Sequence, residues 1–154
     1  MPNIANKATR QTRERFMRGM AQLLVPLGVP RTAARIYGYL LLADEPVSLD
    51  RIMADLEISK STSSVAARVL EMYTLVRRSG EPGTRRVLFE ASDDYDGMIN
   101  TQKRALEQLA ALIREGAQSS ASRKTRERLR TMAEFYLLNR DAIEEVQREW
   151  VARK

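Results

Sequence analysis

The chain has 154 residues, of which 44% are hydrophobic and 30% are charged, and its formal net charge is +6. This composition is typical of a folded protein of about one domain and excludes a disordered chain. The sequence holds no cysteine and no histidine. Disulfides, thiolate metal sites and the commonest general base of enzymes are therefore excluded. We expect neither an enzyme nor a metal or cofactor site.

The same sequence predicts a cytoplasmic protein. No apolar run approaches the roughly 18–20 residues that cross a bilayer, so we expect no membrane segment. The start, MPNIANKATRQTRERF, has basic residues but no apolar core, and it does not resemble a secretory signal. A chain without cysteine suits a reducing compartment.

Positive charge is concentrated in two parts of the chain. Residues 1–36 hold seven basic side chains and one acidic one, and residues 60–86 hold six basic against two acidic. An excess of arginine on particular segments is typical of proteins that bind a polyanion such as DNA. A solvated surface gives the same counts, so charge alone leaves both interpretations open.

Hydrophobic periodicity predicts two helices in the first third of the chain. The first extends from about Thr9 to Leu24 and ends at the proline- and glycine-containing stretch 26–30. The second extends from Arg31 to about Ala43 and is apolar on nearly all sides, which predicts a buried central helix.

Two short helices joined by a tight turn are predicted in residues 48–73. Ser48 is expected to cap the first, with Asp50 in its first turn, and Ser59 to cap the second. The residues expected on the buried side of the second helix are Val65, Val69, Leu70, Met72 and Tyr73. Those expected on its exposed side are Lys60, Ser61, Ser63, Ser64, Ala67 and Arg68.

A β-hairpin and two long helices are predicted to follow. Apolar and β-branched residues at 75–78 and 85–91 lie on either side of a turn containing Gly-Glu-Pro-Gly. Ser92 is expected to cap a helix ending at Gly116, and a last helix runs through residues 129–150 after the joint AQSSAS. The predicted fold is mainly α with a small β-hairpin wing, a winged helix-turn-helix with flanking dimerisation helices.

This order of elements predicts three regions. They are an N-terminal basic arm and helix (1–30), a winged helix-turn-helix domain that binds DNA (31–92), and a C-terminal helical dimerisation region (93–154). The arm is expected to take part in dimerisation and is a candidate for DNA contact. The apolar stripes of the last two helices are too long for one small domain to cover, so a two-fold dimer is expected to bury them. A helical hairpin within one chain is the alternative, and the hairpin and the dimer can both be present.

A helix braced by a neighbour can enter the major groove, which is about 12 Å wide, while the wing contacts the adjacent backbone or minor groove. The residues expected to contact DNA are Ser59, Lys60, Ser61, Thr62, Ser63, Ser64, Arg68, Arg77, Arg85 and Arg86. Two alternatives stay open. Arg77 can simply be the outward residue of an edge strand, and serines on a helix face can simply be solvated.

Residues 48–91 resemble the DNA-binding core of the MarR superfamily, and above all its GbsR-like branch. The resemblance depends on the segment IYGYLLLADEPVSLDRI, the helix start ISKSTSS, and the pattern LExxxLVRR leading into the wing. It extends over about residues 15–115. Thr74 departs from the pattern, since many members of the superfamily have glycine there. The resemblance implies a homodimeric transcriptional regulator whose terminal helices interlock.

The resemblance also implies a small-molecule effector, for which a quaternary ammonium compound is a candidate. Such a cation binds in a cage of aromatic rings. The rings expected to form the cage are Tyr37, Tyr39, Tyr95 and Trp150. Core packing is the alternative for each of them.

We therefore expect a sequence-specific regulator of transcription, a repressor, that binds a pseudo-palindromic site in double-stranded DNA as a homodimer. The alternative is a protein-interaction module that uses the winged helix as a docking surface without specific DNA binding.

Overall fold

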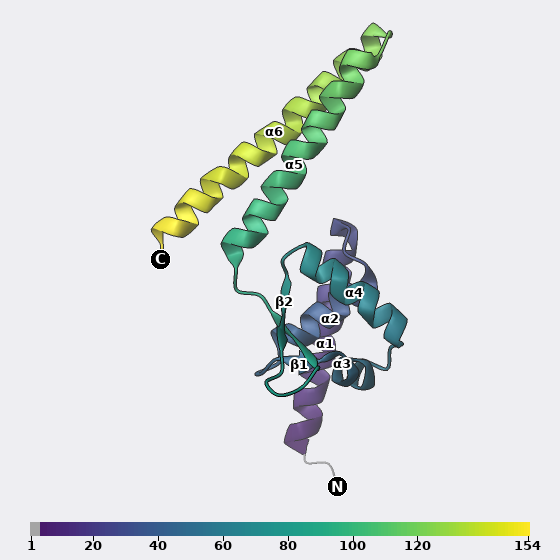
Figure 1. The fold of residues 1–154 in the computed structure, drawn as a ribbon, viewed down its shortest axis with the longest axis vertical. Coiled ribbons are helices and arrows are strands. Elements are labelled where there is room, and N and C mark those ends of the chain that lie inside the picture. Colours follow the sequence, from purple (N-terminus) through teal and green to yellow (C-terminus); the bar gives the residue numbers. More distant parts are fainter. Residues whose placement is uncertain (1–3) are drawn as a thin grey trace. The chain divides into compact units, whose positions relative to one another are not determined.

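Helices make up most of the molecule, and one small sheet interrupts them (Figure 1). The structure, a computed structural model, describes residues 4–154, so residues 1–3 of the predicted arm and the side chains of residues 4–8 lie outside the described part. In chain order the elements are α1 (Ile4–Leu24), η1 (Val25–Leu27), α2 (Arg31–Leu41), β1 (Val47–Ser48), α3 (Leu49–Leu56), α4 (Lys60–Met72), β2 (Val76–Gly80), β3 (Val87–Ala91), α5 (Tyr95–Ser119) and α6 (Arg123–Ala152). The predicted fold class, mainly α with a small antiparallel wing, is confirmed.

Two compact units make up the chain, one ending at Asp93 and the other spanning Asp94–Lys154. The first unit contains α1 to β3, and the second contains α5 and α6. Because α1 packs on α2, the predicted N-terminal helix is part of the first unit.

Helix α2 is the centre of the first unit, as its apolar sequence predicts. It contacts α1, α4 and β3, and Ile36 and Leu40 on it are buried. Gly38 allows the close approach of α1, since a Cβ atom at this position would lie 3.2 Å from the Cα of Met17. The backbones of α1 and α2 therefore meet without an intervening side chain.

The sheet has three antiparallel strands in the order β1-β3-β2. Strands β2 and β3 with the loop between them form the predicted hairpin, called the wing below. Val47 of β1 pairs with Phe89, and Arg78 of β2 pairs with Phe89 from the other side. Strand β1 was not predicted, because two residues are too few to show a period of their own. It attaches the wing to the start of α3.

Side-chain caps fix the starts of the helices. The side chains of Ser48 and Ser59 accept hydrogen bonds from the backbone N–H groups of Arg51 and Thr62, so both predicted caps are confirmed. The predicted cap of α5 at Ser92 is wrong. Asp94 caps this helix instead, while Ser92 is buried and its backbone N–H donates to the carbonyl of Leu75.

The buried side of α4 differs from the predicted one. Its buried residues are Ser63, Ala66, Ala67 and Leu70. Val65 and Met72 were expected inside but are exposed, and Ser63 and Ala67 were expected outside but are buried. The true inner face follows a stripe of small residues, which lets α4 pack closely on α2.

Helix α4 ends in a Schellman motif centred on Thr74. The backbone N–H of Leu75 donates to the carbonyl of Leu70, and that of Thr74 donates to the carbonyl of Glu71, both at 2.9 Å. Thr74 has a φ of +62°, in the left-handed region where glycine is the usual residue at this position. Thr74, at which the sequence departs from the MarR pattern, thus has a strained backbone.

The second unit is an antiparallel hairpin of α5 and α6. Helix α5 continues past the predicted end at Gly116 to Ser119. Three buried alanines line the contact between the helices: Ala110, Ala117 and Ala133. Ion pairs flank the contact, Lys103 with Glu144 at 3.1 Å and Arg140 with Glu107 at 3.0 Å.

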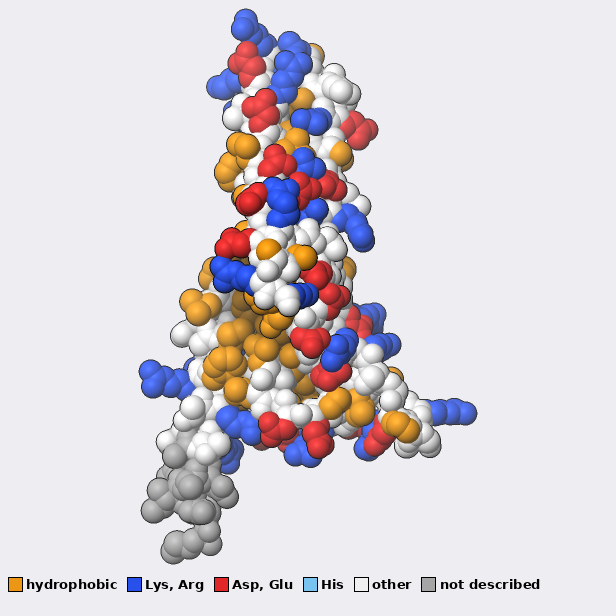
Figure 2. All heavy atoms as spheres, turned by 90° about the vertical axis from the view of Figure 1, so that its left-hand side faces the viewer, with side chains coloured by type: hydrophobic (Ala, Val, Ile, Leu, Met, Phe, Trp, Pro, Cys, Tyr) orange, Lys and Arg blue, Asp and Glu red, His pale blue; other side chains and the backbone are white. Residues whose placement is uncertain are grey.

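Much apolar surface of the hairpin stays exposed, including Leu112, Phe135 and Leu138. In the upper part of Figure 2, which is formed by α5 and α6, apolar side chains lie among charged ones. Within residues 4–154, no helix combines the length and the apolar character that a membrane span requires.

Replacing Thr74 with glycine is expected to stabilise the protein. The left-handed backbone costs a threonine about 1–2 kcal/mol, and the extra freedom of glycine in the unfolded chain offsets part of this gain, which leaves about 0.5–1 kcal/mol. The melting temperature should therefore rise. The same substitution at Thr131, exposed inside α6, should lower it, because glycine is a poor helix former. A lower melting temperature for Thr74→Gly would contradict the inference that the backbone at Thr74 is strained.

Candidate nucleic-acid interface

Helices α3 and α4 are held at a fixed angle by a three-residue turn. Glu57 has a φ of +54°, and the backbone N–H of Ile58 donates to the carbonyl of Met53 at 3.2 Å. Ile52 and Leu56 on α3 are buried in the same core cluster as Leu70 of α4. This packing braces α4 from behind and leaves its other side open.

Hydroxyl groups at the start of α4 bond mostly to one another. The Ser59 side chain donates to the Thr62 hydroxyl at 2.7 Å and accepts from the Thr62 backbone N–H at 3.2 Å. The Ser63 hydroxyl donates to the carbonyl of Ser59, and its side chain is fully buried. This burial disfavours the expected contact of Ser63 with DNA. Ser59 and Thr62 serve first as the cap of the helix.

The outward side of α4 carries Lys60, Ser61 and Arg68 in exposed positions and Ser64 in a half-buried one. Within the described part of the chain, no carboxylate lies within ion-pair distance of Lys60 or Arg68. These two cations therefore keep their charge available for an anion. Val65 lies among these residues, where the sequence pattern did not place it.

A tight turn forms the tip of the wing. The backbone N–H of Thr84 donates to the carbonyl of Glu81 at 3.2 Å, and Gly83 has a φ of +77°. With proline at 82, this is a type II turn, whose third position favours glycine. Arg85 and Arg86 follow the turn and are exposed, and Arg86 lies 3.9 Å from Glu81.

Arg77, which was expected to contact DNA, is occupied by acidic neighbours. Its guanidinium donates to Glu90 at 2.6 Å and to Asp93 at 3.0 Å. The hydrogen bond and the charge of Glu90, with Asp93 adding to them, raise the pKa of Arg77 above its ordinary value. The structure therefore favours the alternative, in which Arg77 is an edge-strand residue that stabilises the wing.

Arg78 was absent from the expected interface, yet it joins the wing to α4. Its Nε lies 2.8 Å from Glu71, and its guanidinium lies 5.6 Å from the centre of the Phe89 ring. A hollow of about 160 Å³ opens beside this pair, with Ser64 and Arg68 in its lining. The exposed side of α4 and the wing therefore face the same space.

Among the aromatic rings expected to bind an effector, Tyr37 and Tyr39 do not face the same side of their helix. Tyr37 and Tyr39 are two positions apart on α2, about 200° around the helix, so their rings lie on different sides. The Tyr39 hydroxyl donates to Asp55 at 2.5 Å, and burial together with Asp55 raises the pKa of Tyr39 to about 12. In the second unit, Tyr95 and Trp150 do meet edge to face, with ring centres 5.2 Å apart.

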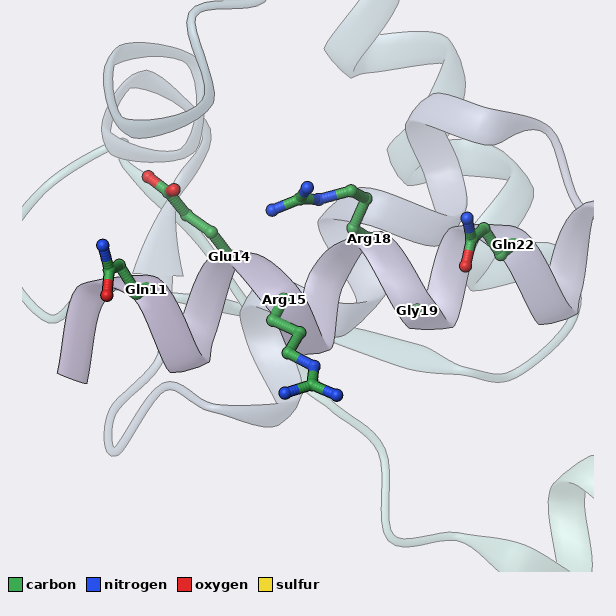
Figure 3. Close-up of a pocket in the computed structure, with 6 residues that line it drawn as sticks. All are labelled: Gln11, Glu14, Arg15, Arg18, Gly19 and Gln22. Carbon is green, nitrogen blue, oxygen red and sulfur yellow. The ribbon is translucent and has the colours of Figure 1, made fainter. Parts of the chain in front are cut away.

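A second hollow, of about 670 Å³, lies along α1 and is lined by residues of that helix (Figure 3). Figure 3 shows Glu14 and Arg18 on one side of the helix and Arg15 on the opposite side. The charged groups therefore do not converge as they would around a ligand. Among residues 4–154, no group of three or more acidic side chains is placed to hold a metal ion.

Two braced helices followed at once by a hairpin define a winged helix-turn-helix, and comparison with known proteins agrees. The chain is 26% identical over 88 residues to the HTH-type transcriptional repressor GbsR of Bacillus subtilis, covering 57% of this chain and 48% of that protein. It is 25% identical over 85 residues to the putative HTH-type transcriptional regulator YvaV of Bacillus subtilis, covering 55% of this chain and 48% of that protein. The chain is thus distantly homologous to these HTH regulators, and the predicted resemblance to the GbsR-like branch is confirmed.

The chain spans about half the length of these curated relatives. Both are named as transcriptional regulators and not as enzymes. A crystal structure of a transcriptional regulator superposes with a TM-score of 0.82 at 22% identity, covering 92% of this chain and 99% of that one, and this likeness supports the fold. No protein-family model matches the chain.

Proposed function

We propose that the protein is a transcriptional repressor that binds a pseudo-palindromic site in double-stranded DNA as a homodimer. The observation that carries the proposal is the outward side of α4, where Lys60 and Arg68 are exposed and have no acidic partner in the described part of the chain, and where Arg68 lines a hollow with Arg78 and Phe89 of the wing. Repression is proposed because one relative is named a repressor, and such a protein acts in the cytoplasm.

The interface divides into two kinds of contact. Ser61, Ser64 and Arg68 lie along the part of α4 that a major groove accommodates, so they are proposed to contact base edges. Lys60 and Arg85 are exposed at the start of α4 and on the wing, so they are proposed to contact phosphates, and Arg86 joins them by moving from Glu81. Ser59 and Thr62 contribute by capping α4, since the Thr62 N–H is bonded to the Ser59 side chain, and the other backbone N–H groups of the helix start suit a phosphate.

The hairpin of α5 and α6 is proposed to pair two copies. Leu112, Phe135 and Leu138 are each at least 60% exposed, and soluble monomers rarely leave apolar patches of this kind uncovered. The predicted alternative of a hairpin within one chain holds, and its outer surface remains available to a second copy. Binding to both half-sites requires the two copies of α4 to lie about 34–36 Å apart, the spacing of successive major grooves.

An effector is proposed only for the ring pair that the structure brings together. Tyr95 and Trp150 are both more than one-third exposed, and Asp96 lies beside Tyr95 in the sequence, paired with Lys154 at 3.0 Å. Two open rings in edge-to-face contact suit a quaternary ammonium cation.

Replacing Arg68 or Arg85 with alanine is expected to weaken binding to DNA in different ways. Arg85→Ala should reduce affinity for every duplex and lower the slope of log K against log salt by about 0.9, the value of one phosphate contact. Arg68→Ala should weaken a selected site by about 1–3 kcal/mol more than random DNA. Fluorescence anisotropy over a salt series measures both.

Arg77→Ala is the matched control, since its guanidinium is held by Glu90 and Asp93. It should leave the salt slope unchanged. If random duplexes show no salt-dependent binding to the unaltered protein, the protein is an interaction module and the proposal fails.

A charge placed on the exposed apolar side of α6 is expected to separate the dimer. Phe135→Glu should give a monomer in analytical ultracentrifugation, because a carboxylate cannot be buried there without a partner. Binding to a two-half-site duplex should weaken strongly, and binding to a half-site should not. Ser119→Asp, exposed at the end of α5, is the control and should remain dimeric. A dimer of Phe135→Glu with unchanged affinity would refute this interface.

Trp150 is the only tryptophan, so its fluorescence reports directly on the proposed effector site. Titration with tetramethylammonium should change its emission, and Tyr95→Leu should abolish the change. Tyr37→Leu should preserve it, because the proposed site is formed by Tyr95 and Trp150 of the second unit. An emission unchanged up to high tetramethylammonium concentration would reject this site.

A further inference from the structure

Val65 is an exposed apolar residue in the middle of the polar side of α4. Its side chain is 58% exposed, whereas Ala66 beside it is 4% exposed. We propose that Val65 determines sequence specificity by contacting the methyl group of a thymine in the major groove. This inference rests on the proposed DNA binding and adds the kind of base that the protein selects.

The position of Val65 on α4 favours contact with bases over contact with phosphates. It is the sixth residue of a helix that starts at Lys60. It lies one helical turn after Ser61 and three residues before Arg68, so the three side chains share one side of the helix. Recognition helices contact base edges with their N-terminal residues. Val65 thus lies between two groups already proposed to face the bases.

The chemistry of valine limits what it can recognise there. Its isopropyl group neither donates nor accepts a hydrogen bond. In the major groove, guanine, adenine and cytosine present nitrogen and oxygen atoms, and thymine adds the C5-methyl group. An apolar side chain against the nitrogen or oxygen atoms would remove water from them without replacing its hydrogen bonds, which is unfavourable. Against the methyl group it buries apolar surface on both sides.

Folding alone does not account for valine at this position. A β-branched residue is a weaker helix former than the alanines that fill the inner side of α4. Its exposure places it outside the core of Ala66, Ala67 and Leu70. The residue therefore adds nothing to the core and is costly in the helix, whereas it suits an apolar contact in the groove.

The probe is the DNA duplex that the unaltered protein binds best when duplexes are selected from a random library. Each thymine of one half-site in the best duplex is then replaced by uracil, which lacks only the C5-methyl group. At one position the unaltered protein should lose about fourfold in affinity, the value of one buried methyl-sized group. Val65→Ala loses the contact in both half-sites, so it should bind the thymine duplex about sixteenfold more weakly, and it should no longer distinguish uracil from thymine. Since alanine favours the helix, this variant should fold, and circular dichroism checks it.

Met72→Ala is the control, because Met72 is also exposed and apolar on α4 but lies at its C-terminal end. It should retain the preference for thymine. If Val65→Ala still shows the loss with uracil, or weakens all duplexes equally, the inference is overturned while the proposed function stands. If selection yields no duplex and no binding depends on salt, the proposed function itself fails.

Discussion

The orientation of α4 depends on how closely its inner side packs on α2. That side consists of Ser63, Ala66, Ala67 and Leu70, and small side chains let the two helices approach. Ser63 can be buried because its hydroxyl donates to the carbonyl of Ser59 and so leaves no unpaired polar group. A larger residue at any of the small positions would push α4 outward and turn its exposed side. The positions of every proposed base contact follow from this packing.

Much of the fold could be predicted because it depends on local chemistry. The caps at Ser48 and Ser59 require only a hydroxyl and an N–H group three residues later, so neighbours in the sequence determine them. The Pro-Gly turn likewise carries its own signal at Gly83. These local signals gave the order of the helices and the wing, and the order led to the helix-turn-helix interpretation.

Features that depend on distant partners could not be predicted. Counting apolar residues placed Val65 on the buried side of α4. The helical spacing of Ser63, Ala66, Ala67 and Leu70 indicates the side that is buried. Ser63 is not counted as a core residue from the sequence, because a hydropathy pattern does not show the hydrogen bond from its hydroxyl to the carbonyl of Ser59. Arg77 looked like a free cation, since its partner Glu90 is 13 residues away and becomes a neighbour only through strand pairing. The exposed cations Lys60 and Arg68 were identified correctly as exposed.

The turn at the tip of the wing has a consequence for the cost of association. Proline at 82 fixes one backbone angle, and the Thr84 hydroxyl accepts from the backbone N–H of Arg86 at 3.1 Å while the Glu81 N–H donates to the Arg86 carbonyl at 2.9 Å. The loop therefore has few conformations to lose when it meets a surface. Preorganisation of this kind reduces the entropy lost on docking. The arginines at the tip can thus be long and mobile themselves while the backbone beneath them remains ordered.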